Sequence, residues 1–443
     1  MNIEGKELIL KVGRTDRLFG AVRAPASKSY THRAIMIAAL NGKTRIVNPL
    51  YCEDTLNTIA LWRQLGVRIK KDTGGLVVEG CGGIPELLHR NSVNVGESGT
   101  LLRFILSILP LAVGQIVVRG RGSLVKRTNR QVIEVLQAWG VEIEGRGPEH
   151  KLPIRIEANG VLRGGTAQVD GSVTSQVISS LLIAAPFARN DTVLSLSSPL
   201  VSKPYVDITV DVLKWAGIKV KRTGARKFGV RKGQAFLPRK AFEVHGDWSA
   251  AAFLLAAAVL MKSDVTIRDL ALDCQGDRRI LAILRSMGAK ITQSGLNVRV
   301  RGPSKLHGVD IDGVDIPDLV PILTVLGCFA SGTTRIRNVA HLVHKESDRL
   351  AMPALELGKL GAKIVVRSDG LVVRHSTLHG GVVSACNDHR IAMSLAVAGL
   401  SAGQAVTIRG AGCIAKSYPG FAADMKKLHA NVQLLRCKRE SGL

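Results

Sequence analysis

The chain has 443 residues, of which 46% are hydrophobic and 22% are charged, and its formal net charge is +26. This length predicts two or three domains, and this composition excludes a disordered chain. The charge fits three kinds of partner: nucleic acid, an anionic membrane or small polyanionic molecules. Because Lys and Arg are spread along the chain, with only four Tyr and four Trp for base stacking, we expect no functional nucleic acid.

The start of the chain, its apolar stretches and its cysteines together predict a cytoplasmic protein. The first 14 residues mix charged with apolar side chains, unlike a signal peptide. The longest apolar stretches, residues 104–111 and 250–261, are shorter than the roughly 20 residues that span a bilayer. The seven cysteines are far apart and form no CxxC pair, so we expect neither disulfides nor a metal, and no membrane partner.

One pattern recurs along the chain: an amphipathic helix, a glycine, and then alternating apolar and polar residues. In chain order it reads LGVRI, WGVEI, WAGIKV, MGAKI and LGAKI, with a weaker sixth copy, KLHANVQLL. We expect each glycine to end its helix in the left-handed conformation and the following residues to form a half-buried strand. The spacing predicts six related units in two domains. The glycines of the five clear copies are Gly66, Gly140, Gly217, Gly288 and Gly361.

Three further predicted helices are apolar on several faces. They cover residues 101–109, 177–185 and 249–260. A helix that is apolar all round has no face for solvent, so we expect these three to be buried in the core.

The first phosphate-handling motif is PASKSYTHR, at residues 25–33, where small residues, hydroxyls and two cations begin an apolar helix. The exposed backbone amides and the helix dipole favour an anion there, and Lys28 and Arg33 add full charges. No glycine-rich GxxxxGK segment precedes the motif, so it is not a Walker A loop.

Seven more motifs follow in one order along the chain. They are GESGTLLR (96–103), DGSVTSQ (170–176), VSKPY (201–205), IPDLVP (316–321), HKESDRL (344–350), DHRIAM (388–393) and AKSYPGF (415–421). With the six-unit repeat, they resemble the 5-enolpyruvylshikimate-3-phosphate synthase family of enolpyruvyl transferases from end to end.

The resemblance implies an α/β fold of two similar domains, each made of three βαβαββ units in an inside-out α/β barrel, with the substrate cleft between them. Chain order then predicts one domain at residues 25–245 and the other at 1–24 plus 246–443. The implied reaction transfers the enolpyruvyl group of phosphoenolpyruvate to the 5-hydroxyl of shikimate 3-phosphate and releases phosphate, in the shikimate pathway to chorismate and aromatic amino acids. It needs no metal or cofactor, and a two-domain cleft needs no partner subunit, so we expect a monomer.

Motif positions carry the family's functional residues over to this chain. The two substrates bring two phosphates and two carboxylates, which call for cations, and Arg is suited to bind them in pairs of hydrogen bonds. The resemblance makes Asp318 the base for the hydroxyl and Glu346 the proton donor to the methylene carbon, with Lys28 stabilising charge. The implied phosphoenolpyruvate-binding residues are Lys28, Gly99, Arg127, Gln176, Arg349, Arg390 and Lys416. The implied shikimate 3-phosphate-binding residues are Lys28, Ser29, Arg33, Thr174, Ser175, Gln176, Ser202, Tyr205, Asp318, His341 and Lys345.

The chain departs from the commonest family pattern at three positions. Glu97 stands where Asn is frequent, Thr128 where Pro is frequent, and His341 where Asn is frequent. Glu97 is the least expected of these, because a carboxylate beside an anionic ligand repels it unless a cation lies nearby. We expect its side chain to face away from the substrates.

Three alternatives stay open at this point. A UDP-N-acetylglucosamine enolpyruvyl transferase shares the fold and the donor, but carries a reactive Cys in the loop that corresponds to residues 119–130, which contain none. A basic RNA-binding or RNA-end-processing protein would explain the charge but not the paired acidic motifs. A catalytically inactive homologue would keep the fold alone.

Overall fold

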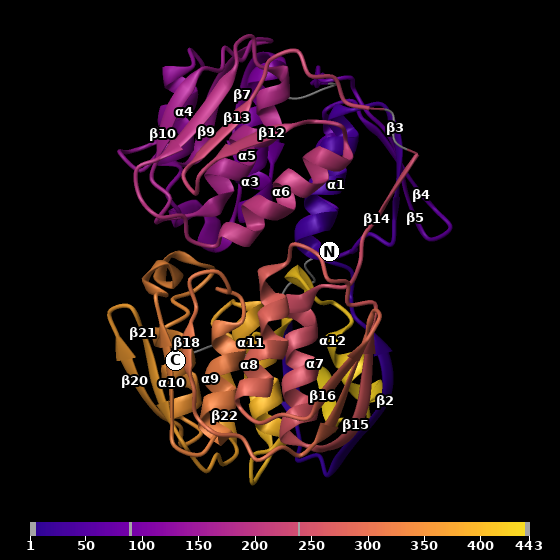
Figure 1. The fold of residues 1–443 in the computed structure, drawn as a ribbon, viewed down its shortest axis with the longest axis vertical. Helices are drawn as coiled ribbons and strands as arrows, with labels where there is room; N and C mark the ends of the chain where they lie inside the picture. The colour runs from indigo at the N-terminus through magenta and orange to yellow at the C-terminus, as the bar shows by residue number, and fades with distance from the viewer. Residues whose placement is uncertain (1–5, 88–90, 238–239, 439–443) are drawn as a thin grey trace. The chain divides into compact units, whose positions relative to one another are not determined.

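The structure is a computed structural model that describes residues 6–87, 91–237 and 240–438 (Figure 1). The chain divides into two compact units. We call Ala26–Val244 the continuous unit, and Met1–Pro25 with His245–Leu443 the split unit. Each unit has its own cluster of buried hydrophobic side chains.

The continuous unit contains helices and strands in regular alternation. Its helices are α1 (Lys28–Leu40), α2 (Glu53–Gln64), α3 (Gly99–Ile108), α4 (Arg130–Ala138), α5 (Ser175–Ala184) and α6 (Lys203–Trp215), with short 3-10 helices η1 (Leu109–Leu111), η2 (Gly122–Lys126) and η3 (Ala185–Phe187). Its strands are β3 (Lys43–Val47), β4 (Arg68–Asp72), β5 (Gly75–Glu79), β6 (Ser92–Asn94), β7 (Val113–Arg119), β8 (Glu142–Arg146), β9 (Lys151–Asn159), β10 (Thr166–Val169), β11 (Thr192–Leu196), β12 (Val220–Thr223), β13 (Lys227–Val230) and β14 (Ala241–Glu243).

The split unit repeats this alternation. Its helices are α7 (Trp248–Leu260), α8 (Ile280–Ser286), α9 (Val320–Phe329), α10 (Ala351–Gly358), α11 (His389–Leu400) and α12 (Phe421–Lys427), with η4 (Gly276–Arg279), η5 (Ala340–His344) and η6 (Ala411–Lys416). Its strands are β1 (Lys6–Val12), β2 (Arg17–Arg23), β15 (Lys262–Arg268), β16 (Ile291–Ser294), β17 (Asn297–Gly302), β18 (Asp310–Asp312), β19 (Thr333–Arg337), β20 (Lys363–Arg367), β21 (Gly370–Arg374), β22 (Gly381–Ser384), β23 (Val406–Arg409) and β24 (Val432–Lys438).

Within the described residues these strands form six four-stranded sheets, three in each unit, with one pairing scheme. In the sheet β6-β7-β9-β8, for example, β6 runs parallel to β7, and β9 runs antiparallel to β7 and β8. A helix connects the two parallel strands, as a parallel crossover requires. Among the described residues, three sheets (β6-β7-β9-β8, β10-β11-β13-β12 and β18-β19-β21-β20) and their helices follow one another in the chain as βαβαββ units, and the other three sheets each take one strand from a distant part of the chain.

Strands β2 and β14 pair with strands that lie far from them in the sequence. β14 pairs in parallel with β3, from Ala241 opposite Arg45 to Glu243 opposite Val47. β2 pairs in parallel with β15 of the split unit, although α1 follows it directly in the chain. The chain therefore passes from one unit to the other at residues 25–26 and 244–245.

The sheets surround helices that are buried on all sides, as predicted for three of them. All residues of α7 from Trp248 to Val259 are buried, and so are Leu101–Ile108 of α3 and Val177–Ala184 of α5. In the split unit α7, α9 and α11 pack on one another, with β20 and β21 to one side and β2, β15 and β16 to the other (Figure 1).

The predicted left-handed glycines are confirmed. The five glycines have φ angles of 81°, 81°, 93°, 102° and 94° in chain order, and each lies one or two residues beyond the end of its helix, α2, α4, α6, α8 or α10. In the sixth copy His429 takes this place with φ 66°, and its ring stacks on Phe19 with centroids 3.7 Å apart. No helix in the described ranges is long and apolar enough to cross a membrane.

Candidate active site

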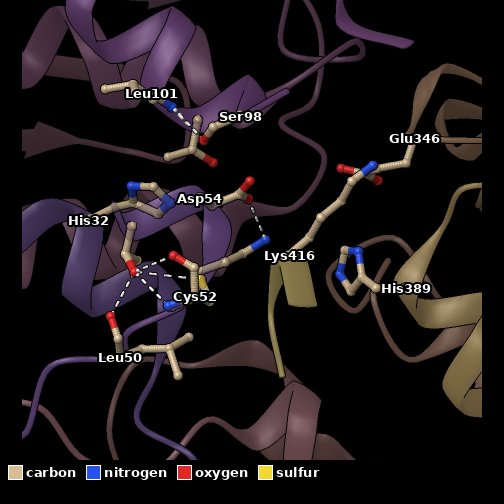
Figure 2. Close-up of polar contacts among 12 residues, drawn as sticks. His32, Leu50, Cys52, Asp54, Ser98, Leu101, Glu346, His389 and Lys416 are labelled. Carbon is tan, nitrogen blue, oxygen red and sulfur yellow. Dashed lines mark hydrogen bonds and ion pairs between the residues drawn. The ribbon is translucent and has the colours of Figure 1, made fainter. Parts of the chain in front are cut away.

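Most predicted residues of the continuous unit lie at or directly before the first turns of its helices. Lys28 is the first residue of α1, and its Nζ lies 3.0 Å from Oδ2 of Asp54, in the first turn of α2. Figure 2 shows Asp54 with this contact, and nearby Ser98, whose side chain accepts a hydrogen bond from the backbone of Leu101. Ser27 caps α1 in the same way.

The start of α3 is joined to the start of α5 and bordered by arginines. The Gln176 Nε2 donates to the Thr100 hydroxyl at 3.2 Å, and the Thr174 hydroxyl caps α5. A Cβ added to Gly99 would lie 3.0 Å from Nη1 of Arg127 and 3.1 Å from Nη1 of Arg103. Two guanidinium groups and the amides of two helix starts therefore lie together, an arrangement that favours an anion.

Arg33 is buried, with 2% exposure, and its guanidinium bonds to its own unit. It donates to the Thr209 hydroxyl at 2.7 Å and the Tyr205 carbonyl at 2.8 Å in α6. It also donates to the carbonyl of Ser29 and the hydroxyl of Ser179, so it ties α1, α5 and α6 together. Burial lowers the pKa of Arg33 to about 10. The predicted shikimate 3-phosphate contact stays a prediction.

The remaining predicted residues of this unit lie at the starts of α1, α5 and α6. Ser29 is half-buried and Ser175 buried, each in the first turn of its helix. Ser202, directly before α6, is buried in a left-handed conformation with φ 55°, and its hydroxyl has no hydrogen-bond partner among the described residues. Tyr205 is half-buried in the first turn of α6.

In the split unit, Arg349 joins three carboxylates. It is 1% exposed, and its Nη1 donates to Asp318 at 2.6 Å, its Nη2 to Glu346 at 2.8 Å and its Nε to Asp388 at 2.8 Å. Burial alone would lower the pKa of Arg349, but Asp388, Glu346 and Asp318 outweigh it and raise the pKa well above its usual value. This arginine therefore stays charged and fixes the position of both predicted acid–base groups.

Asp318 precedes α9 and is held by two cations. Its Oδ2 accepts from Nη2 of Arg390 at 3.0 Å, and its Oδ1 accepts from Arg349. Burial would raise the pKa of Asp318, but Arg390, Arg349 and Lys345 together hold it well below the usual range. Asp318 is thus ionised, as a base must be, but its proton affinity is low while both arginines are bound to it.

The last three predicted residues of this unit lie on or beside 3-10 helices. Burial, with Lys345 and His344, lowers the pKa of His341 in η5 to about 4, so this ring is neutral at neutral pH. Lys345 is half-buried directly after η5. Lys416 is the last residue of η6, is 5% exposed and donates to the Asn387 carbonyl at 3.3 Å.

Two carboxylates of these clusters were missed from the sequence. Asp54 pairs with Lys28, and Asp388 both caps α11 and binds Arg349. For Asp388 a signal existed, because Asp directly before a helical segment is a preferred N-cap. The carboxylate of Glu97, which departs from the commonest family pattern, accepts a hydrogen bond from the backbone N–H of Ser123. Among the described residues no group of three or more His, Cys, Asp or Glu side chains could hold a metal ion.

Comparison with solved structures gives the class of protein. An EPSP synthase from Acinetobacter baumannii matches with a TM-score of 0.82 and 26% identity, over 97% of this chain and 100% of that one. An enolpyruvyl transferase from Streptomyces tendae shares the fold, with a TM-score of 0.78 and 20% identity, over 98% of this chain and 100% of that one. The fold is that of the enolpyruvyl transferases.

Sequence comparison gives the family. The model of the family EPSP synthase (3-phosphoshikimate 1-carboxyvinyltransferase) matches residues 12–425. A 3-phosphoshikimate 1-carboxyvinyltransferase of Methanocaldococcus jannaschii is 40% identical over 433 residues, covering 96% of this chain and 99% of the relative. One of Methanocella arvoryzae is 40% identical over 429 residues, covering 96% and 100%. The chain belongs to the EPSP synthase family, which confirms the predicted family and the two-domain α/β fold class.

Proposed function

We propose that this protein joins phosphoenolpyruvate to the 5-hydroxyl of shikimate 3-phosphate, with release of phosphate, and that the residues at the helix starts of both units carry out the reaction. Enolpyruvyl transfer in the shikimate pathway is the activity for which its family and its relatives are named. The observation that carries the assignment of residues is the Arg349 cluster, where one buried cation holds Asp318 and Glu346.

We assign the anionic groups of the substrates to the cations and amides at these helix starts. Lys28, Arg127, Arg390 and Lys416 would compensate the phosphate and carboxylate of phosphoenolpyruvate. Gly99 supports this assignment, because any side chain there would come within about 3 Å of the Arg127 guanidinium. The hydroxyls and amides at the starts of α1, α5 and α6 would hold shikimate 3-phosphate.

The proposed base becomes active when phosphoenolpyruvate binds. Arg349 and Arg390 hold the pKa of Asp318 low in the described structure. An anionic substrate that takes hydrogen bonds from these arginines would reduce their effect on Asp318, and the pKa of its carboxyl would rise. Asp318 would therefore gain proton affinity only when phosphoenolpyruvate is bound.

The proposed reaction is an addition followed by an elimination. Asp318 accepts the proton of the 5-hydroxyl of shikimate 3-phosphate while the hydroxyl oxygen bonds to C2 of phosphoenolpyruvate. Glu346 donates a proton to the methylene carbon. In the second stage the C2–O bond to phosphate breaks, the methyl group returns a proton to Glu346, the double bond forms again, and the proton held by Asp318 leaves with the phosphate. Lys28, which is held by Asp54, lies at a helix start where it can stabilise the developing charge.

We also propose that the continuous and split units are the two domains of the enzyme, in accordance with the predicted boundaries at residues 25 and 245. The protein would act as a cytoplasmic monomer without a cofactor, with small-molecule substrates and no functional nucleic acid. Sedimentation of the purified protein, with and without both substrates, tests the monomer.

The function is tested by phosphate release from phosphoenolpyruvate with and without shikimate 3-phosphate. We expect release only with shikimate 3-phosphate, and a loss of at least about a hundredfold in Asp318→Ala and in Arg390→Ala. Asp310→Ala is the control, since Asp310 is exposed and pairs with Arg335 and Arg337 on a sheet surface. Release with UDP-N-acetylglucosamine instead would indicate the other transferase. No release with either acceptor, combined with salt-dependent retention on RNA, would contradict the proposal.

A further inference from the structure

The Glu97 carboxylate binds the backbone of the loop that carries Arg127. Its Oε1 accepts the N–H of Ser123 at 2.9 Å. Ser123 lies in η2, and Arg127 is the residue directly after η2, with its own N–H bonded to the Leu124 carbonyl. One short 3-10 turn therefore separates the Glu97 contact from the arginine.

At Gly122 the loop passes so close to Glu97 that a side chain at this position would displace the Glu97 carboxylate. Gly122 has φ 60°, and a Cβ added to it would lie 1.6 Å from Oε1 of Glu97. On the other side of the contact, Arg121 N–H donates to the Gly96 carbonyl at 2.9 Å. A Cβ at Gly120 would lie 3.0 Å from that same carbonyl oxygen. The segments 96–97 and 120–123 are thus joined by two hydrogen bonds and spaced by two glycines.

Glu97 is also close in sequence to the start of α3, the helix start beside which Arg127 lies. Glu97 is followed by the cap Ser98 and then by Gly99, the first residue of α3. The Arg127 guanidinium lies 3.0 Å from the position of a Cβ on Gly99. The segment 97–99 therefore contacts the loop that carries Arg127 at one end and begins α3 at the other.

We propose that Glu97 is a positioning residue that fixes the loop 120–127, and through it holds Arg127 at the start of α3 for the anionic donor substrate. The proposal rests on the proposed function only in the identity of that substrate. It also accounts for a carboxylate near an anion site, because Glu97 directs its charge to a backbone amide, where a charge-assisted bond is strong.

The test compares two substitutions of similar size. Glu97→Gln keeps an oxygen acceptor for the Ser123 N–H, whereas Glu97→Met fills the space without one. We expect Glu97→Met to raise KM for phosphoenolpyruvate roughly tenfold or more, with KM for shikimate 3-phosphate within about twofold and kcat within about threefold of wild type. In Glu97→Gln, KM for phosphoenolpyruvate should stay within about threefold of wild type.

The matched control is Glu53→Gln, which removes the other carboxylate bound to this loop. Glu53 pairs with Arg121 at 2.6 Å, but the two side chains are 32% and 59% exposed. Such an exposed pair contributes little, so all three kinetic constants should stay within about twofold. An equal rise of KM for both substrates in Glu97→Met, or equal effects of Glu97→Met and Glu97→Gln, would overturn the proposal.

A second measurement is independent of activity. Hydrogen–deuterium exchange of the peptide that covers residues 119–127 should be faster in Glu97→Met than in wild type, and close to wild type in Glu97→Gln. Unchanged exchange in Glu97→Met would overturn the positioning role even if the kinetics changed. If wild type shows no transferase activity, the proposed function fails, and the exchange experiment still decides whether Glu97 holds the loop.

Discussion

At the scale of single residues, the two most buried arginines of the candidate site use their donors on the protein itself. Arg33 bonds to residues 146 to 176 positions away in sequence, and Arg349 to three carboxylates. The motifs marked both arginines as candidate substrate-binding residues, and that role stays a prediction. The motifs could not show which donors bond to the protein itself, because most of the acceptors lie 31 to 176 positions away in sequence and only the fold brings them together.

The structural contribution of Arg33 can be separated from its predicted contact with substrate. Arg33→Lys keeps the charge but leaves the Thr209 hydroxyl and the Tyr205 carbonyl without their planar donor. We expect the free energy of unfolding, from urea titration, to fall by about 2–4 kcal/mol. Arg335→Lys, at an exposed pair with Asp310, should change it by less than about 0.5 kcal/mol. Unchanged stability with a raised KM for shikimate 3-phosphate would assign Arg33 to the ligand alone.

Asp277 makes stability depend on pH. It is 3% exposed and bonds to the Ser249 hydroxyl, while its Oδ1 has no hydrogen-bond partner in the described part of the chain. Burial, with the charge of Asp318, raises the pKa of Asp277 to about 7. The carboxyl has a pKa of about 3.9 in the unfolded chain. Between the unfolded and the folded pKa, the folded state therefore holds a proton that the unfolded state releases. This contribution to stability is present below about pH 4 and is lost as the pH rises through 7.

Asp277→Asn should remove this dependence, because an amide does not ionise. We expect the variant to gain about 2–4 kcal/mol of unfolding free energy over wild type at pH 8, and little near pH 4. Urea titrations of both proteins at the two pH values measure the difference, in which the other titrating groups cancel. Asp312→Asn, at an exposed position, should show no such difference. A gain that is equal at both pH values would contradict burial as the cause.

At the scale of elements, local patterns predicted the helices and their ends, but not the partners of the strands. The left-handed cap was visible because glycine marks it, and the sixth copy was weak because His429 takes that conformation. The pairing of β2 with β15 and of β14 with β3 left no such signal. Arg17 in β2 pairs with Lys262, and Arg45 in β3 pairs with Ala241, so the paired segments lie roughly 200 to 250 residues apart. Pairing over that distance depends on the whole fold.

Two glycines at the end of α10 should respond in opposite ways to the same substitution. Gly361 has φ 94°, and a Cβ there would lie 3.2 Å from the ring of His379. Gly358 is helical and exposed, and a Cβ there would meet nothing within 4 Å. We expect Gly361→Ala to lower the unfolding free energy by about 1–2 kcal/mol, and Gly358→Ala to raise it by about 0.5–1 kcal/mol. Chemical denaturation checks both, and a loss in both variants would contradict the assignment of the cap.

At the scale of the whole molecule, each unit has three sheets and its own core, in the described residues, and the chain passes between the units twice. The repeat predicted this duplication, since six copies divide evenly into two sets of three. The split unit needs β1 and β2 from the start of the chain for two of its sheets. The continuous unit takes all its strands from one uninterrupted stretch of sequence.

A fragment of residues 26–244 should therefore fold alone, provided that it keeps β14. Phe242 in this strand is 9% exposed and packs edge-on against Trp215, with the ring centroids 4.9 Å apart. Val244 is fully buried. Burying two such side chains contributes about 3–6 kcal/mol, a large part of the stability of a domain. We expect fragment 26–244 to unfold cooperatively on heating, followed by circular dichroism, and fragment 26–240 to unfold at least about 10 °C lower. Equal melting of the two fragments would show that β14 does not complete the core, and a non-cooperative melt of the longer one would show that the continuous unit is not an independent domain.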